Sequence, residues 1–240
     1  MSGGTLQVSF APRVNDSNPD PRVACVILLD TSESMRGDAM QALNDGFGHF
    51  CDAIKEDPLA RKRTEVAVIT FGGSARLEIP FTEGRQLGAK TFAAGGSTPL
   101  GSALDMAVNE IALQKAAYKE SGIEYYRPWL FVMTDGEPTD GLTYRAAAEK
   151  VCALEAQRSL VVMPILIGDE ASAGDLALLS TVRAPRQMRG LEFTSLFSWL
   201  SASMAIVSNS NEFGSSGAST SAAGGPPQVP LPPTDGWTKW

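Results

Sequence analysis

The sequence predicts a three-layer α/β fold in which a doubly wound, mostly parallel central sheet is flanked by helices on both faces. Two observations support this prediction. Short continuous apolar runs, typical of strands covered on both faces, alternate with longer stretches in which apolar residues recur every three or four positions. Because this alternation forms right-handed βαβ units, the strands are expected to lie parallel.

In the first half of the chain, residues 23–29 form a continuous apolar run and are predicted to be a central strand. An amphipathic helix that ends before Pro58 is expected next, because apolar residues follow at helical spacing: Met40, Leu43, Phe47, Phe50 and Ile54. Residues 64–71 are predicted to be a second central strand. Residues 76–81 alternate polar and apolar side chains, which favours an edge strand.

The second half of the chain repeats this alternation. Two further buried strands are predicted at residues 129–133 and 160–167. Helices are predicted around them at residues 99–118, 144–154, 175–179 and 196–207. In open α/β sheets, ligands bind beyond the carboxyl ends of the strands, so functional residues are expected there.

Composition divides the chain into three parts. Residues 1–21 are predicted to be an N-terminal extension, since their second half is rich in Pro, Asn and Asp. Residues 22–208 form the predicted domain. Residues 209–240 consist mainly of Ser, Gly, Ala and Pro, which predicts a flexible, disordered tail. The tail ends near Trp237 and Trp240, which either dock back on the domain or bind a partner.

Charge and composition exclude several classes of function. With 27 acidic and 20 basic residues, the net charge of −7 argues against binding to nucleic acid or to an anionic membrane surface. No apolar run approaches the roughly 18 residues that a membrane helix needs, and the N-terminus does not resemble a secretory signal. The three scattered cysteines suit neither a disulfide framework nor a zinc site. A cytoplasmic location is therefore expected. The single histidine, His49, lies off the apolar helix stripe, which weakens any mechanism built on a histidine base.

Short oxygen-bearing side chains follow the predicted strands. Asp30, Ser32 and Ser34 follow the first strand, and Asp135 follows the strand at 129–133. Thr98 lies in a Gly-rich turn before a helix. Two carboxylates with neutral hydroxyls suit a hard divalent cation, so the sequence predicts a site for Mg²⁺, with Mn²⁺ or Ca²⁺ as alternatives. Each residue also has a plain structural explanation, as a helix cap or as part of a turn.

This pattern resembles a known metal site. Asp30-x-Ser32-x-Ser34, Thr98 in a Gly-Gly-Ser-Thr-Pro turn and Asp135-Gly resemble, in order and spacing, the metal-ion-dependent adhesion site of von Willebrand factor type A domains. The resemblance implies a Rossmann-like fold, in which the hydroxyls bind the metal directly and one or both aspartates act through water. Glu33 departs from the pattern, because many members have glycine there.

A closer resemblance suggests a cellular context. Residues 125–129 (Tyr-Tyr-Arg-Pro-Trp), residues 134–140 and the Pro-rich tail resemble bacterial TerY/YegL-like proteins of tellurium-resistance and stress-response systems. This resemblance implies a cytoplasmic protein that works with a PP2C-type phosphatase and a Ser/Thr kinase. The expected function is that of a non-enzymatic interaction module, whose bound metal captures a carboxylate of a partner protein.

Two other functions remain open at this point. One is a Mg²⁺-dependent phosphohydrolase that uses Asp30, although haloacid-dehalogenase-type enzymes need a second Asp where this chain has Ser32. The other is a metal-independent scaffold that binds through the tail and through Tyr126 and Trp129. Those two rings, with Tyr125, would instead brace the core if they lie beside the third buried strand.

Overall fold

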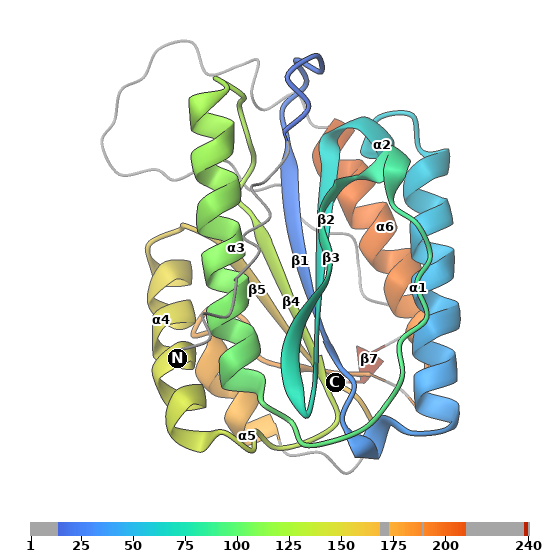
Figure 1. Cartoon of the computed structure of the whole chain (residues 1–240), viewed down its shortest axis with the longest axis vertical. Coiled ribbons are helices and arrows are strands. Elements are labelled where there is room, and N and C mark those ends of the chain that lie inside the picture. Colours follow the sequence, from blue (N-terminus) through green and yellow to red (C-terminus); the bar gives the residue numbers. More distant parts are fainter. Residues whose placement is uncertain (1–13, 169–172, 189, 210–237, 240) are drawn as a thin grey trace, which may run out of the picture.

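A computed structural model describes residues 14–168, 173–188, 190–209 and 238–239 (Figure 1). In this part of the chain, the strands form one sheet in the order β3-β2-β1-β4-β5-β6-β7. Their bounds are β1 Val23–Asp30, β2 Thr64–Gly72, β3 Ser74–Glu83, β4 Trp129–Thr134, β5 Val161–Leu166, β6 Arg186–Met188 and β7 Thr238–Lys239. The strands β2, β1, β4, β5 and β6 are parallel, whereas β3 and β7 pair antiparallel at the two edges.

Helices cover both faces of the sheet, as Figure 1 shows. Their bounds are α1 Asp38–Glu56, α2 Ala60–Arg63, α3 Leu100–Glu120, α4 Gly141–Ala156, α5 Ala173–Leu176 and α6 Phe193–Asn209, with 3₁₀ turns η1 Glu33–Met35, η2 Gly84–Gln86 and η3 Ala177–Leu179. Helices α1 and α6 lie on one face, and α3 and α4 lie on the other. The predicted three-layer, doubly wound α/β fold is confirmed.

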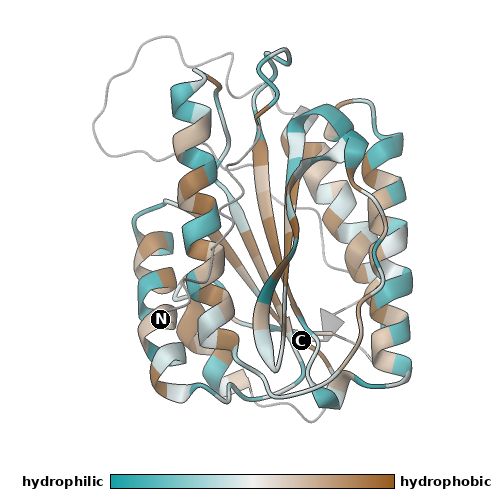
Figure 2. Ribbon diagram, viewed as in Figure 1, coloured by the Kyte–Doolittle hydropathy of each residue, from teal (hydrophilic) through white to brown (hydrophobic). Residues whose placement is uncertain are grey.

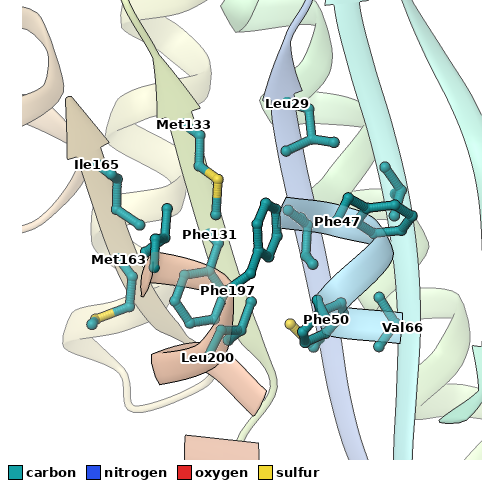
Figure 3. Close-up of a cluster of buried hydrophobic side chains, with 14 of the residues drawn as sticks. Leu29, Phe47, Phe50, Val66, Phe131, Met133, Met163, Ile165, Phe197 and Leu200 are labelled. Carbon is teal, nitrogen blue, oxygen red and sulfur yellow. The ribbon is translucent and has the colours of Figure 1, made fainter. Parts of the chain in front are cut away.

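Aromatic side chains from α1, α6 and β4 pack together in the core between the sheet and the α1/α6 layer (Figure 3). Phe47 and Phe50 of α1 lie 5.9 Å and 5.6 Å from Phe197 of α6 between ring centroids. Phe131 of β4 meets Trp199 of α6 edge-on at 6.3 Å. These buried rings join the two helices to the central strands and supply much of the apolar area removed from water.

Smaller side chains fill the opposite face, where α3 and α4 pack on the sheet. Val26, Leu28 and Val132 from the strands meet Leu104 of α3 and Ala147 of α4 in one buried cluster. Every residue of β1 is buried, which explains its continuous apolar run. Figure 2 shows the same pattern as hydrophobic strands beneath helices of mixed character.

The predicted strands and helices of the first half agree with the structure, and β3 is the expected edge strand. Five short elements have no counterpart in the predictions: α2, β6, β7 and the 3₁₀ turns η1 and η2. Asn209 is the last residue of α6, and residues 210–237 of the predicted disordered tail lie outside the described residues, as do Trp237 and Trp240. At Thr238–Lys239 the structure differs from that prediction, since these two residues pair with the open edge of β6.

None of the helices within the described ranges has the length and apolarity that crossing a bilayer requires.

Candidate metal centre

The candidate site lies where the winding of the sheet reverses. From β1 the chain continues to β2 and β3 on one side, and it then crosses to β4, β5 and β6 on the other. The carboxyl ends of β1 and β4 are therefore neighbours with no helix between them, at the lower edge of Figure 1. A switch point of this kind is the usual ligand position in open α/β sheets.

A chain of hydrogen bonds joins four of the five predicted ligands there. Asp30 Oδ1 accepts a bond from the Ser32 N–H at 2.8 Å. The hydroxyls of Ser32 and Ser34 lie 3.0 Å apart, and Ser34 Oγ donates to Asp135 Oδ1 at 2.8 Å. Asp30 and Asp135 are 105 positions apart in the sequence, yet the same chain of hydrogen bonds connects their carboxylates.

The electrostatics of this cluster favour a cation. Asp30 is fully buried, and burial raises the pKa of its carboxyl to about 6, with a smaller rise from the charge of Asp135. Hydrogen bonds from Ser32 and Thr134 oppose this rise in pKa. Neither aspartate takes part in a salt bridge found within the described ranges. The protein thus holds two neighbouring carboxylates without a lysine or arginine to balance them.

Thr98 reaches the same edge from the loop before α3. Its backbone N–H donates to Thr139 Oγ1 at 3.1 Å, and its carbonyl accepts from the Thr139 N–H at 2.9 Å. Its hydroxyl lies 4.0 Å from the position that a Cβ would take at Gly136, the residue after Asp135. Pro99 occupies the N-cap position of α3, where no side-chain cap bond forms, so Thr98 does not serve as the helix cap.

Glycines allow three loops to meet behind the cluster. A Cβ at Gly72, the last residue of β2, would lie 2.2 Å from the carbonyl oxygen of Thr31. Gly95 donates its N–H to the same carbonyl at 2.8 Å, and Glu33 donates its N–H to the Gly96 carbonyl at 3.0 Å. Gly96 has φ 80°, which an L side chain rarely adopts. A Cβ at Gly96 would also lie 2.6 Å from backbone atoms of Gly73, so glycine at this position lets two loops approach closely beside the site.

Sequence reasoning missed the part of Thr134, the last residue of β4. Its hydroxyl donates to Asp30 Oδ2 at 2.5 Å and accepts from the Gly136 N–H at 3.2 Å. It therefore links the β1 carboxylate to the loop that carries Asp135. The signal was present, since a threonine directly precedes the Asp-Gly pair at the end of a buried strand.

The acidic residues around the site differ in their surroundings. Asp140 accepts bonds from the N–H groups of Gly101 at 3.0 Å and Ser102 at 2.9 Å, so it ties the start of α3 to the start of α4. Glu33 is exposed and pairs with Arg36 at 2.7 Å. Glu137 is exposed beside the site.

The aromatic residues next to β4 belong to the core. Tyr126 and Trp129 are 1% and 2% exposed, so they cannot form the recognition surface of a metal-independent scaffold in this fold. Tyr125 is partly buried against Tyr118, with ring centroids 5.3 Å apart. His49 is exposed on α1, as its place off the apolar stripe predicts.

A hard divalent cation fits this donor set. Two carboxylates and three hydroxyls are oxygen ligands of the kind that Mg²⁺, Mn²⁺ and Ca²⁺ accept. No cluster of three or more His, Cys, Asp or Glu suited to a metal occurs in the described ranges, so a zinc site of thiolate and imidazole ligands has no support there.

Comparison with known proteins agrees with this fold. The structure of a von Willebrand factor type A protein from Catenulispora acidiphila matches 77% of this chain and 43% of its own, with a TM-score of 0.56 and 19% identity. Manganese-loaded TRAP protein from Plasmodium vivax matches 73% of this chain and 71% of its own, at a TM-score of 0.52 and 20% identity. Proximal thread matrix protein 1 from the mussel byssus matches 78% of this chain, with a TM-score of 0.52 and 17% identity. This chain spans about half (49%) of that protein.

Sequence comparison identifies the family. A search of curated proteins found no match. The sequence model of the von Willebrand factor type A domain matches residues 25–188, which include all five predicted ligands and most of the sheet. The chain therefore belongs to the von Willebrand factor type A domain family, a family of protein-interaction and adhesion modules.

Proposed function

We propose that this protein is a non-enzymatic interaction module that binds Mg²⁺ and captures an acidic residue of a partner protein. The ligands would be Asp30, Ser32, Ser34, Thr98 and Asp135. The observation that carries the proposal is the hydrogen-bonded chain from Asp30 through both serines to Asp135, at the switch point of the sheet.

The burial of these residues supports a site that opens on one side. Asp30 and Ser32 are buried, Asp135 is half-buried and Ser34 is exposed, so a partner side chain would approach past Ser34. When bound, the cation supplies positive charge that two carboxylates and neutral hydroxyls leave available to a further carboxylate. Thr134, which is buried and donates to Asp30 Oδ2, would orient that ligand from beneath.

Mg²⁺, Mn²⁺ and Ca²⁺ compete for a site of this kind. The Plasmodium vivax TRAP structure was obtained with manganese bound, which supports a divalent cation in this fold. We propose Mg²⁺ as the ion in the cell, with Mn²⁺ and Ca²⁺ as competitors, because an oxygen-only donor set accepts all three.

Isothermal titration of the purified chain with Mg²⁺ tests the metal site. We expect Asp30→Ala and Asp135→Ala to abolish binding, because each removes one of two charged ligands. Asp45→Ala is the matched control, since Asp45 is an exposed aspartate on α1. Circular dichroism establishes that each variant is folded. Equal affinity in the folded wild-type and Asp30→Ala proteins would refute the proposal.

The partner proposal rests on the TerY/YegL-like resemblance. We propose that the protein acts in the cytoplasm of a bacterium, in a tellurite or stress response, with a PP2C-type phosphatase and a Ser/Thr kinase. Co-purification from native lysate, once with Mg²⁺ and once with chelator, tests this. The proposal requires that these two enzymes are recovered with Mg²⁺ and lost with chelator, and that Asp135→Ala does not recover them.

A phosphohydrolase is the enzymatic rival. Its general acid would have to lie at position 32, where a serine instead contacts Asp30 and Ser34. We therefore expect no turnover of p-nitrophenyl phosphate by the Mg²⁺-loaded protein. Turnover that Asp30→Asn removes would favour the rival.

A further inference from the structure

A single basic residue lies among the acidic residues that surround the candidate metal centre. The three loops that meet there span residues 31–37, 94–99 and 135–140. Arg36 is the only lysine or arginine in these loops. Together with the last residue of β1, the same loops hold five acidic residues: Asp30, Glu33, Asp135, Glu137 and Asp140. A charge change at Arg36 therefore alters the balance of charge that a ligand meets at this edge of the sheet.

Arg36 pairs with one of these carboxylates through two contacts. Its Nε lies 2.7 Å from Glu33 Oε1, and its Nη2 donates to Glu33 Oε2 at 2.7 Å. The short turn η1 brings the two residues together, since the Arg36 N–H donates to the Glu33 carbonyl at 3.1 Å. Paired contacts of this kind fix the orientation of the guanidinium against the carboxylate.

Glu33 lies at the rim of the metal centre. It is the residue between the predicted ligands Ser32 and Ser34, whose hydroxyls are 3.0 Å apart. Its N–H donates to the Gly96 carbonyl at 3.0 Å, and its Oε2 lies 3.8 Å from the position that a Cβ would take at Gly95. The carboxylate of Glu33 thus borders the glycine-rich loop that precedes α3.

The pair also faces the side on which a partner would approach. The side chains of Glu33 and Arg36 are 61% and 67% exposed, and Ser34 between them is exposed. An unpaired Glu33 carboxylate at this rim would attract the cation and repel an incoming carboxylate. Arg36 offsets that charge at contact distance, so both effects of Glu33 are reduced.

We propose that Arg36 is a specificity-determining residue, which allows the metal centre to accept a carboxylate as the incoming ligand. This inference rests on the proposed function, because it concerns the carboxylate that the bound cation captures. Without Arg36 the loops around the cation carry acidic residues alone. Such a site binds the cation more tightly and the partner's carboxylate more weakly.

Two titrations of the full chain at low ionic strength test this. Isothermal titration with Mg²⁺ measures cation binding, and nuclear magnetic resonance titration of the Mg²⁺-saturated chain with N-acetylaspartate amide measures carboxylate binding. Arg36→Gln raises Mg²⁺ affinity and lowers affinity for the probe, each by about threefold, which is the effect of one unit charge acting through water over about 6 Å. A purely structural role for Arg36 would lower both affinities, because damage to the loop would displace the ligands.

A second variant and a control identify the charge as the cause. Glu33→Gln changes the two affinities in the opposite directions, and the double variant Glu33→Gln/Arg36→Gln returns both to near the wild-type values. Arg61→Gln leaves both affinities unchanged, since Arg61 is an exposed arginine of α2, before the amino end of β2. At about 1 M salt the differences among the variants disappear, because the Debye length falls to about 3 Å.

Three results overturn the inference: wild-type affinities in Arg36→Gln, changes of both affinities in the same direction, or the same changes in Arg61→Gln. Each of these leaves the metal site standing if the wild-type chain binds Mg²⁺ and Asp30→Ala does not. A wild-type chain that bound no Mg²⁺ would instead overturn the proposed function, and this inference with it.

Discussion

Asp30 is a carboxylate that the fold removes from water, and this determines how its charge contributes to stability. Its pKa rises from 3.8 to about 6, mainly because burial disfavours the charged form. Without metal, the folded protein therefore holds a proton on Asp30 at a pH where the unfolded chain has released it. The free energy of unfolding must then fall as the pH rises from about 4 to about 6.

Replacing Asp30 with Asn removes this pH dependence. In chelator, the wild-type protein should lose roughly 3 kcal/mol of stability between about pH 4 and pH 7 relative to Asp30→Asn, since one pKa unit corresponds to about 1.4 kcal/mol. Urea unfolding of both proteins at the two pH values measures the difference. Parallel pH profiles for the two proteins would contradict a raised pKa at Asp30.

Glu65 is a second buried carboxylate, and it lies within the apolar strand β2. It pairs with the fully buried Arg22 at 3.2 Å and accepts from Gln114 at 2.5 Å and Tyr118 at 2.6 Å. Removing its charge leaves the guanidinium of Arg22 buried without its partner, which typically costs 3–5 kcal/mol.

We expect Glu65→Gln to lower the free energy of unfolding by about 3 kcal/mol in urea titrations. Glu78→Gln is the matched control, because Glu78 of β3 pairs with the half-exposed Lys90 in the loop after η2, and such pairs contribute roughly 0–1 kcal/mol. If Glu65→Gln and Glu78→Gln lowered the free energy of unfolding by the same small amount, the Arg22–Glu65 pair would have no special role in stability.

Among the helices, α1 and α6 approach closely at a glycine. A Cβ at Gly46 would lie 2.9 Å from backbone and side-chain atoms of Phe193 and 2.9 Å from the ring of Phe197. Gly48, two residues further along α1, has no atom within 4 Å of its Cβ position. The same substitution on one helix should therefore have opposite effects at the two positions.

Gly46→Ala should destabilise the fold by about 1–3 kcal/mol, because the added methyl forces α6 away from the core. Gly48→Ala should stabilise it by about 0.5–1 kcal/mol, because alanine is the better helix former. Thermal unfolding monitored by circular dichroism distinguishes the two. A stabilised Gly46→Ala protein would show that α6 does not pack on α1 as described.

Across the whole molecule, the acidic oxygens of the candidate metal centre gather at one edge of the sheet, at the carboxyl ends of β1 and β4. A ligand that binds only the folded state stabilises the entire domain, so metal binding can be measured through global unfolding.

At a Mg²⁺ concentration of 100 times its Kd, the free energy of unfolding should rise by about 2.7 kcal/mol, or roughly 5–10 °C in melting temperature. Asp135→Ala should show no such rise. A thermal shift assay with increasing Mg²⁺ checks both, and an equal shift in the two proteins would indicate non-specific salt stabilisation.

Local pattern was enough to predict most elements and to select Asp30, Ser32, Ser34, Thr98 and Asp135 as candidate ligands. Continuous apolar runs identify strands covered on both faces whatever their neighbours are, and strand ends identify the edge where polar side chains collect. The short strand β6 escaped prediction because its three residues carry no periodic signal and its position depends on pairing with β5.

By itself, the sequence determined the fold class and the residue types at the strand ends, because apolar runs and helical periodicity are patterns of consecutive residues. Only the tertiary structure decided that Thr134 would link Asp30 to the Asp135 loop, that Gly72 would lie against Thr31, and that Glu65 would be buried with Arg22. The physical reason is that these contacts join residues far apart in the chain. Their energies depend on distance and burial, which the order of residues does not record.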